Sequence, residues 1–168
     1  MTAASPRGRI TGMPSVDIVR ESPLWEGQPD IDATLGRAIA EASIGASTKD
    51  AELAIVLTDD ARIRALNRIW RGIDKPTNVL SFPAEDRGEG APALLGDIVI
   101  AYETTKREAL AQDTPFLHYL AHLTVHGFLH LRGYDHEADG EAEIMERLER
   151  QILARLGIGD PYAARDAG

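Results

Sequence analysis

The chain contains five histidines, and all of them fall in one short segment, at His118, His122, His126, His130 and His136. The first four are spaced by four residues. Each step of four moves a side chain by roughly 40° around a helix, so the three at 122, 126 and 130 share one face. His118 drifts toward the side and is the least suited to join them. Two imidazoles at i and i+4 can both direct a ring nitrogen at one metal ion.

His136 provides a third ligand after a break in the helix. Gly133 lets the chain turn back, and the whole segment has the spacing His-x-x-x-His-x-x-Gly-x-x-His of the metzincin zinc proteases. Three protein ligands leave a fourth position open for water, which is typical of catalytic zinc, and the ion lowers the pKa of that water to about 7. We therefore predict one Zn²⁺ bound by His126, His130 and His136, with His122 hydrogen-bonding near the site, and metal-assisted hydrolysis as its chemistry.

Gly127 occupies the position at which metzincins carry their catalytic glutamate, directly after the first histidine ligand. A glycine cannot accept a proton, so peptide hydrolysis by the usual route is disfavoured. Asp135, Asp97 or Glu85 could replace the missing base. Asp135 and Asp97 could instead support the site, because ligand histidines are commonly oriented by a carboxylate. The sequence leaves the general base open.

The composition is that of a soluble globular domain, with 43% hydrophobic and 27% charged residues and no cysteine. Without cysteine, a transition-metal site must use histidine and carboxylate ligands. We expect a cytoplasmic protein with no membrane association. The net charge of −9 argues against a general nucleic-acid binder, but the charges are uneven. Residues 62–75 are rich in arginine and lysine, whereas the acidic residues of 137–149 are interpreted as a solvated helix face.

Apolar spacing and turn residues predict nine elements that must position these side chains. Strands are expected at 16–20, 51–57, 78–82 and 96–101. Helices are expected at 31–44, 59–70, 102–112, 114–131 and 140–156. Thr114 would cap the fourth helix with Pro115 at its first position, and the last helix would bury Ile144, Leu148, Ile152 and Leu156.

This order predicts an α/β (α+β) fold, with helices packed on a four-stranded mixed sheet and the metal site on a central histidine-bearing helix. Residues 14–162 are expected to form a single domain. A disordered leader (1–13), a mobile surface loop (84–93) and a flexible tail (163–168) complete the chain.

The segment His122-Leu-Thr-Val-His126-Gly-Phe-Leu-His130-Leu-Arg-Gly-Tyr-Asp-His136 closely resembles the signature of the YbeY family of bacterial rRNA-maturation endoribonucleases. The similarity extends over roughly residues 50 to 162. It includes Leu66-Asn67 with Arg71, the segment from Lys75 to Pro83, Leu95-Gly-Asp97 and Asp160-Pro-Tyr162.

This resemblance implies a metal-dependent endoribonuclease specific for single-stranded RNA. Such an enzyme would act on rRNA precursors, in maturation of the 3′ end of 16S rRNA and in late ribosome quality control. Its partners would include the small ribosomal subunit or ribosomal proteins. The resemblance also implies that the histidine helix faces a cleft beside the mixed sheet.

Several side chains outside the histidine segment could handle RNA. Arg71 matches the family's functional arginine, and a guanidinium suits a phosphate bidentately. Lys75 is a second candidate for a phosphate contact. Asn78 and Ser81 could line the cleft. Trp70, Phe82 and Tyr134 could stack on bases, although core packing explains Trp70 and Phe82 better.

Two alternative functions stay open at this point. One is a metzincin-like metalloprotease or another metal hydrolase that uses a different base. The other is a non-catalytic ribosome assembly factor, in which the metal only stabilises the turn after the histidine helix.

Overall fold

The computed structural model describes residues 13–85, 93–135 and 137–163. The predicted leader, the predicted loop at 84–93 and the predicted tail lie almost entirely outside these ranges. His136, the third predicted metal ligand, also lies outside the described residues.

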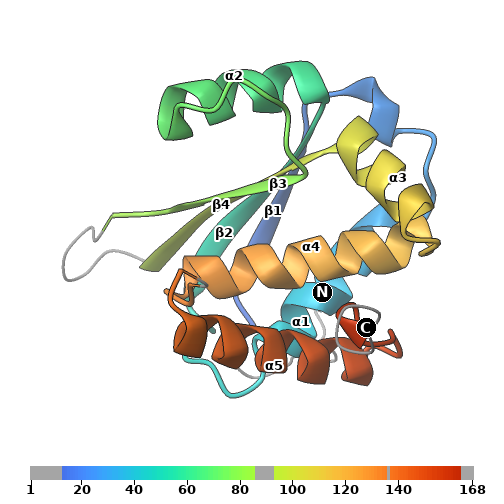
Figure 1. Cartoon of the computed structure of the whole chain (residues 1–168). Coiled ribbons are helices and arrows are strands. Elements are labelled where there is room, and N and C mark those ends of the chain that lie inside the picture. Colours follow the sequence, from blue (N-terminus) through green and yellow to red (C-terminus); the bar gives the residue numbers. More distant parts are fainter. Residues whose placement is uncertain (1–12, 86–92, 136, 164–168) are drawn as a thin grey trace, which may run out of the picture.

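A four-stranded mixed sheet forms the centre of the molecule (Figure 1), as predicted. Its strands are β1 (Ser15–Arg20), β2 (Ala51–Thr58), β3 (Val79–Pro83) and β4 (Ala93–Ala101), in the order β1-β2-β4-β3. β1, β2 and β4 run parallel to one another, and β3 runs antiparallel to β4. β3 therefore lies at one end of the described sheet, with one side paired to β4.

Helices cover both faces of this sheet. α2 (Asp60–Arg71) lies on one face, and α4 (Phe116–Leu131) packs against the other, where it contacts β3 and β4. α1 (Ile31–Ala42) and α5 (Asp139–Arg155) pack on α4, and α3 (Tyr102–Ala111) follows β4 directly. The histidine helix α4 is thus central, as the sequence indicates.

The starts of α2 and α4 show how local sequence sets helix boundaries. Asp59 caps α2, since its carboxylate accepts a hydrogen bond from the Arg62 backbone at 2.9 Å. The predicted threonine cap of α4 is wrong. Pro115 has extended backbone (ψ 141°) and precedes the first helical residue, while the Thr114 hydroxyl donates to the Gln112 carbonyl instead.

α5 packs three of its four predicted apolar positions, Leu148, Ile152 and Leu156, against the core, but not Ile144. Ile144 is 46% exposed, whereas Met145, Glu149, Ile152 and Leu153 are buried. A spacing of four drifts around a helix, so Ile144, at one end of the predicted stripe, falls outside the buried face, which Met145 and Glu149 occupy instead. The prediction that the acidic residues of this helix form a solvated face is therefore wrong for Glu149.

Candidate metal centre

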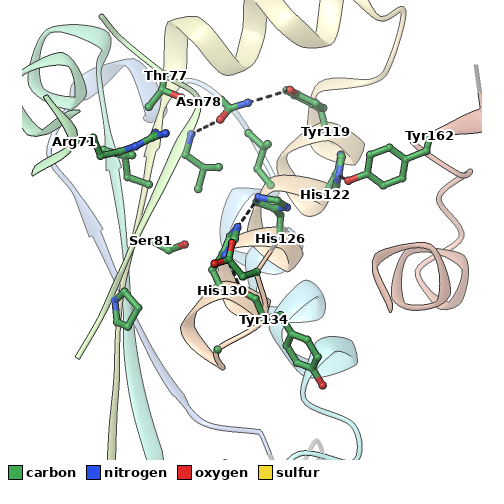
Figure 2. A pocket seen from close by; sticks show the side chains of 16 residues that line it. Arg71, Thr77, Asn78, Ser81, Tyr119, His122, His126, His130, Tyr134 and Tyr162 are labelled. Carbon is green, nitrogen blue, oxygen red and sulfur yellow. Dashed lines mark hydrogen bonds between the residues drawn. The ribbon is translucent and has the colours of Figure 1, made fainter. Parts of the chain in front are cut away.

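A cleft of about 630 Å³ lies between β3 and α4, in the size range of sites that bind small ligands. α4 contributes histidines to one wall, and β3 with the end of α2 forms the other (Figure 2). Residues that the sequence singles out and that line this cleft are Arg71, Asn78, Ser81, His122, His126, His130, Tyr134, Asp135 and Tyr162.

His126 and His130 turn their Nε2 atoms toward each other, 3.1 Å apart. Their Nδ1 atoms are both occupied. Nδ1 of His126 is 2.6 Å from a carboxylate oxygen of Glu149, and Nδ1 of His130 is 2.9 Å from the Tyr134 carbonyl. A carbonyl oxygen only accepts, so Nδ1 of His130 carries the proton and its Nε2 carries a lone pair.

The same argument applies to His126, whose Nδ1 donates to the ionised Glu149. When both imidazoles are neutral, the lone pairs of the two Nε2 atoms face each other at 3.1 Å and repel. A cation bound between these two nitrogens would remove the repulsion. Imidazole nitrogens are ordinary zinc ligands. Within the described residues no third histidine, cysteine or carboxylate completes a ligand set, and His136 is not among those residues. The two histidines fit a metal ion, and the third ligand stays a prediction.

Glu149 is the functional residue that the sequence interpretation missed. It is fully buried, and its second carboxylate oxygen accepts a hydrogen bond from the Tyr162 hydroxyl. Burial alone would raise the pKa of Glu149, but the hydrogen bonds from His126 and Tyr162 outweigh burial and the pKa is lowered. The sequence did hold a signal for this role. Glu149 follows Met145 by four residues and precedes Ile152 by three, so it lies on an otherwise apolar face of the helix.

His122 lies deeper along the same helix face but does not join the two converging nitrogens. Its Nε2 is 3.5 Å from the Tyr162 hydroxyl, and its ring meets Tyr119 and Tyr162 edge-on. Burial lowers the pKa of His122. His118 is exposed, on the side of α4 that faces a separate hollow.

Ser81 and Gly127 show how tightly α4 packs against the sheet. The Ser81 hydroxyl donates to the Gly127 carbonyl at 3.1 Å. A Cβ at position 127 would come within 2.8 Å of Cγ2 of the buried Ile98 and 3.2 Å of Oγ of Ser81. The residue after the first predicted ligand thus faces the sheet instead of the cleft. A metzincin-type glutamate has no room at this position.

The remaining predicted residues divide between the cleft and other surfaces. Arg71 lines the cleft from the end of α2, and Asp135 lines it near the end of α4. Lys75 is exposed and does not line it; its carbonyl is held by the Asn67 side chain at 2.9 Å. Lys75 is therefore not placed for a phosphate contact inside the cleft.

Asp97 does not support the metal centre, contrary to the prediction. Side chains alternate along a strand, and its neighbour Ile98 points at α4. Asp97 therefore lies on the opposite face of the sheet, where it lines a separate hollow with Asp17 and Ala54. Glu85, another candidate base, is exposed and does not line the cleft.

Trp70 is not a core residue, again contrary to the prediction. Its side chain is 68% exposed, and its ring lies 6.0 Å from that of the partly buried Phe82. Tyr134 lies in the cleft lining.

Across the described ranges, no helix combines the length and the apolar character required to span a bilayer.

Comparisons with known proteins agree with the resemblance noted above. The model of the family described as Endoribonuclease YbeY matches residues 28–157. Endoribonuclease YbeY of Bradyrhizobium sp. strain BTAi1 is 56% identical over 161 residues, covering 92% of this chain and 95% of that protein. Endoribonuclease YbeY of Nitrobacter winogradskyi is 58% identical over 157 residues, covering 89% and 83%.

A solved structure shares the fold. The solution structure of TM1509 from Thermotoga maritima aligns with a TM-score of 0.54 at 23% identity, over 84% of this chain and 91% of that one. The family model and the two relatives each cover most of the sequence, including the histidine helix and Glu149. The chain belongs to the YbeY family of endoribonucleases.

Proposed function

We propose that this protein is a zinc-dependent endoribonuclease that cleaves single-stranded RNA. It acts in the cytoplasm on rRNA precursors, in maturation of the 3′ end of 16S rRNA and in late ribosome quality control, in contact with the small ribosomal subunit. The family membership supports the endoribonuclease class. The observation that carries the metal centre is the convergence of the His126 and His130 Nε2 atoms at 3.1 Å, with both Nδ1 atoms held by acceptors.

His126, His130 and His136 would hold one Zn²⁺ with an open position. Bound zinc supplies Lewis acidity toward a phosphate oxygen. The protein's own contribution is to orient the rings. Glu149 and the Tyr134 carbonyl each accept a hydrogen bond from an Nδ1–H group, which selects the tautomer with the lone pair on Nε2 and makes that nitrogen a better ligand. Tyr162 in turn holds the Glu149 carboxylate from the far side.

Arg71 is the proposed phosphate-binding residue. It lines the cleft from the wall opposite the histidines, and within the described residues its guanidinium makes no ion pair with a carboxylate. A guanidinium there can bind a phosphodiester oxygen pair and stabilise the charge that develops during cleavage. Asp135, which lines the cleft near the end of α4, is the proposed supporting carboxylate.

The first experiment compares substrates. Purified protein is stripped of metal, reloaded with zinc and offered single-stranded RNA, the same sequence as a duplex, and casein. We expect cleavage of the single strand only, lost on chelation and in His130→Ala. Proteolysis that disappears in His126→Ala, while RNA stays intact, would favour the metalloprotease alternative.

Two further measurements define the reaction. Metal analysis of protein purified without added metal identifies the resident ion. A 2′,3′-cyclic phosphate on the product implicates the 2′-hydroxyl as nucleophile, whereas a 3′-hydroxyl end implicates water. Full rescue of a deletion strain by an Arg71→Glu variant that no longer cleaves RNA would favour the non-catalytic assembly factor.

A further inference from the structure

The C-terminal end of α2 carries an exposed aromatic side chain, Trp70, that the proposed catalytic centre does not use. We propose that Trp70 is a stacking subsite for a base of the single-stranded RNA substrate, adjacent to the mouth of the cleft. This inference rests on the proposed ribonuclease function. It identifies how the enzyme holds an unpaired strand next to the bond that it cleaves.

The exposure of Trp70 is the first observation. Trp70 is 68% exposed, whereas Trp25, the other tryptophan of the chain, is 0% exposed. Ile69 beside it is 66% exposed. Phe82 of β3 contacts the indole at 6.0 Å with the two rings inclined by 65°. The indole is thus supported by Phe82 while most of its surface remains open to a planar ligand.

The position of this pair relative to the cleft is the second observation. Trp70 directly precedes Arg71, which lines the cleft, and Phe82 lies between Ser81 and Pro83, which also line it. Alternation along β3 turns Ser81 toward α4 and Phe82 toward α2. β3 is at the end of the described sheet, with α4 on one face and α2 on the other (Figure 1), so a strand of RNA that crosses it would meet the histidine helix on one side and the helix that carries Trp70 on the other.

The charges around Trp70 indicate which class of ligand would bind there. Arg62 and Arg64 of α2 are paired with Asp59 and Asp74. The cations closer to Trp70 in the sequence are exposed and make no ion pair with any carboxylate of the described chain: Arg68, Arg71 and Lys75. A protein with a net charge of −9 thus carries exposed cations outside ion pairs within a few residues of an exposed aromatic ring. Single-strand binding sites combine these two features, the cations for phosphates and the ring for bases. A basic protein partner would meet like charges here.

Intrinsic fluorescence tests the proposal directly, because only one of the two tryptophans is accessible. A single-stranded DNA oligonucleotide has the same stacking bases but no 2′-hydroxyl, and serves as the uncut probe. With zinc-loaded protein, we expect the probe to quench the emission and to protect it from acrylamide. Trp70→Phe, which retains only the buried Trp25, should lose both responses while still binding.

Steady-state cleavage of a single-stranded RNA oligonucleotide gives the energetic measure. Base–aromatic stacking corresponds to roughly 5- to 150-fold in affinity. We expect Trp70→Ala to raise KM by about that factor with little change in kcat, and Trp70→Phe to restore most of the loss. Leu110→Ala is the matched control, since Leu110 is 73% exposed on α3 and does not line the cleft.

The outcomes separate this inference from the proposed function. An unchanged KM in Trp70→Ala, or a probe that binds without altering the fluorescence, would overturn the stacking subsite while leaving the ribonuclease intact. Absence of RNA cleavage by the zinc-loaded wild-type protein would instead contradict the proposed function. An abasic RNA should bind Trp70→Ala and wild-type protein equally; a persistent difference would also count against stacking.

Discussion

The two walls of the cleft are built in opposite ways. On the α4 wall, His126 is hydrogen-bonded to the fully buried Glu149, which Tyr162 holds from the other side. On the α2 wall, Arg71 is exposed and its neighbour Trp70 is 68% exposed, without ion pairs from the described residues. One wall is fixed by buried contacts, and the other is open to solvent.

This difference follows from what each wall has to do. Ring nitrogens that share a metal ion must be held within fractions of an ångström, and buried hydrogen bonds provide that rigidity. An arginine and an indole that receive a flexible RNA strand need access and reach more than a fixed geometry. The histidine wall is therefore expected to respond to mutation in metal affinity and stability, and the α2 wall in substrate affinity and rate.

Removing the buried carboxylate should have the largest effect. In Glu149→Gln the side chain keeps its shape but loses the charge that orients His126, and partners of this kind are worth 10- to 100-fold in metal affinity. We expect the zinc dissociation constant, measured by competition with a chelating dye, to rise by about that factor. Glu143→Gln, an exposed change on the same helix, is the control. Equal zinc affinity in both variants would contradict the role of Glu149.

Removing Arg71 should leave the metal in place. A charge-assisted hydrogen bond is worth roughly 1.5–3 kcal/mol, so Arg71→Ala is expected to lower kcat/KM for single-stranded RNA by about 10- to 150-fold. Zinc content and the unfolding midpoint should stay at the wild-type level. Arg62→Ala, at the other end of α2, provides a control for lost positive charge. If Arg62→Ala lowered kcat/KM as much as Arg71→Ala, general electrostatic attraction of RNA, and not a specific phosphate contact of Arg71, would explain the lower activity.

The fit of α4 against the sheet can be tested with a pair of glycines. Gly127→Ala would place a methyl group within 2.8 Å of Ile98 Cγ2, and overpacking of this kind costs about 1–3 kcal/mol of unfolding free energy. Gly36 lies in α1 with open space around it, so Gly36→Ala should stabilise the protein by about 0.5–1 kcal/mol. Urea unfolding measures both. Two changes of the same sign would show that α4 packs less tightly than the structure indicates.

The smallest effect on stability is expected from removing the Tyr119 hydroxyl, which lies where the two walls meet. Tyr119 donates to Glu108 at 2.6 Å, and Asn78 links both residues. Burial and the neighbouring Glu108 raise the pKa of Tyr119 from 10.0 to about 12. A raised pKa means that the folded state favours the protonated phenol. Its contribution to stability is therefore present below pH 10 and is lost as the pH rises toward about 12.

Spectrophotometric titration should show one tyrosine that ionises last and is missing in Tyr119→Phe. At neutral pH this variant should lose only about 1 kcal/mol of unfolding free energy. An unchanged titration curve would place the phenol in a more polar environment than the structure shows.

Most of the secondary structure could be predicted from the sequence because its signals are local. The helical spacing before Gly45, the cap at Asp59 and the turn before Pro76 each act within a few residues. The failures have a common cause. Trp70 was assigned to the core and Asp97 to the metal centre by residue type, but which face of an element is covered depends on what packs against it.

The convergence of His126 and His130 follows from the sequence alone, because the i, i+4 geometry of a helix is set by the backbone. The absence of the metzincin base also follows from the sequence, since glycine has no side chain to supply it. The reason for a glycine at position 127 becomes visible in the packing, where Ile98 of β4 approaches the helix too closely for a side chain. The packing of α5 likewise sets which nitrogen of His126 carries the proton, by bringing Glu149 against the ring from twenty-three residues away.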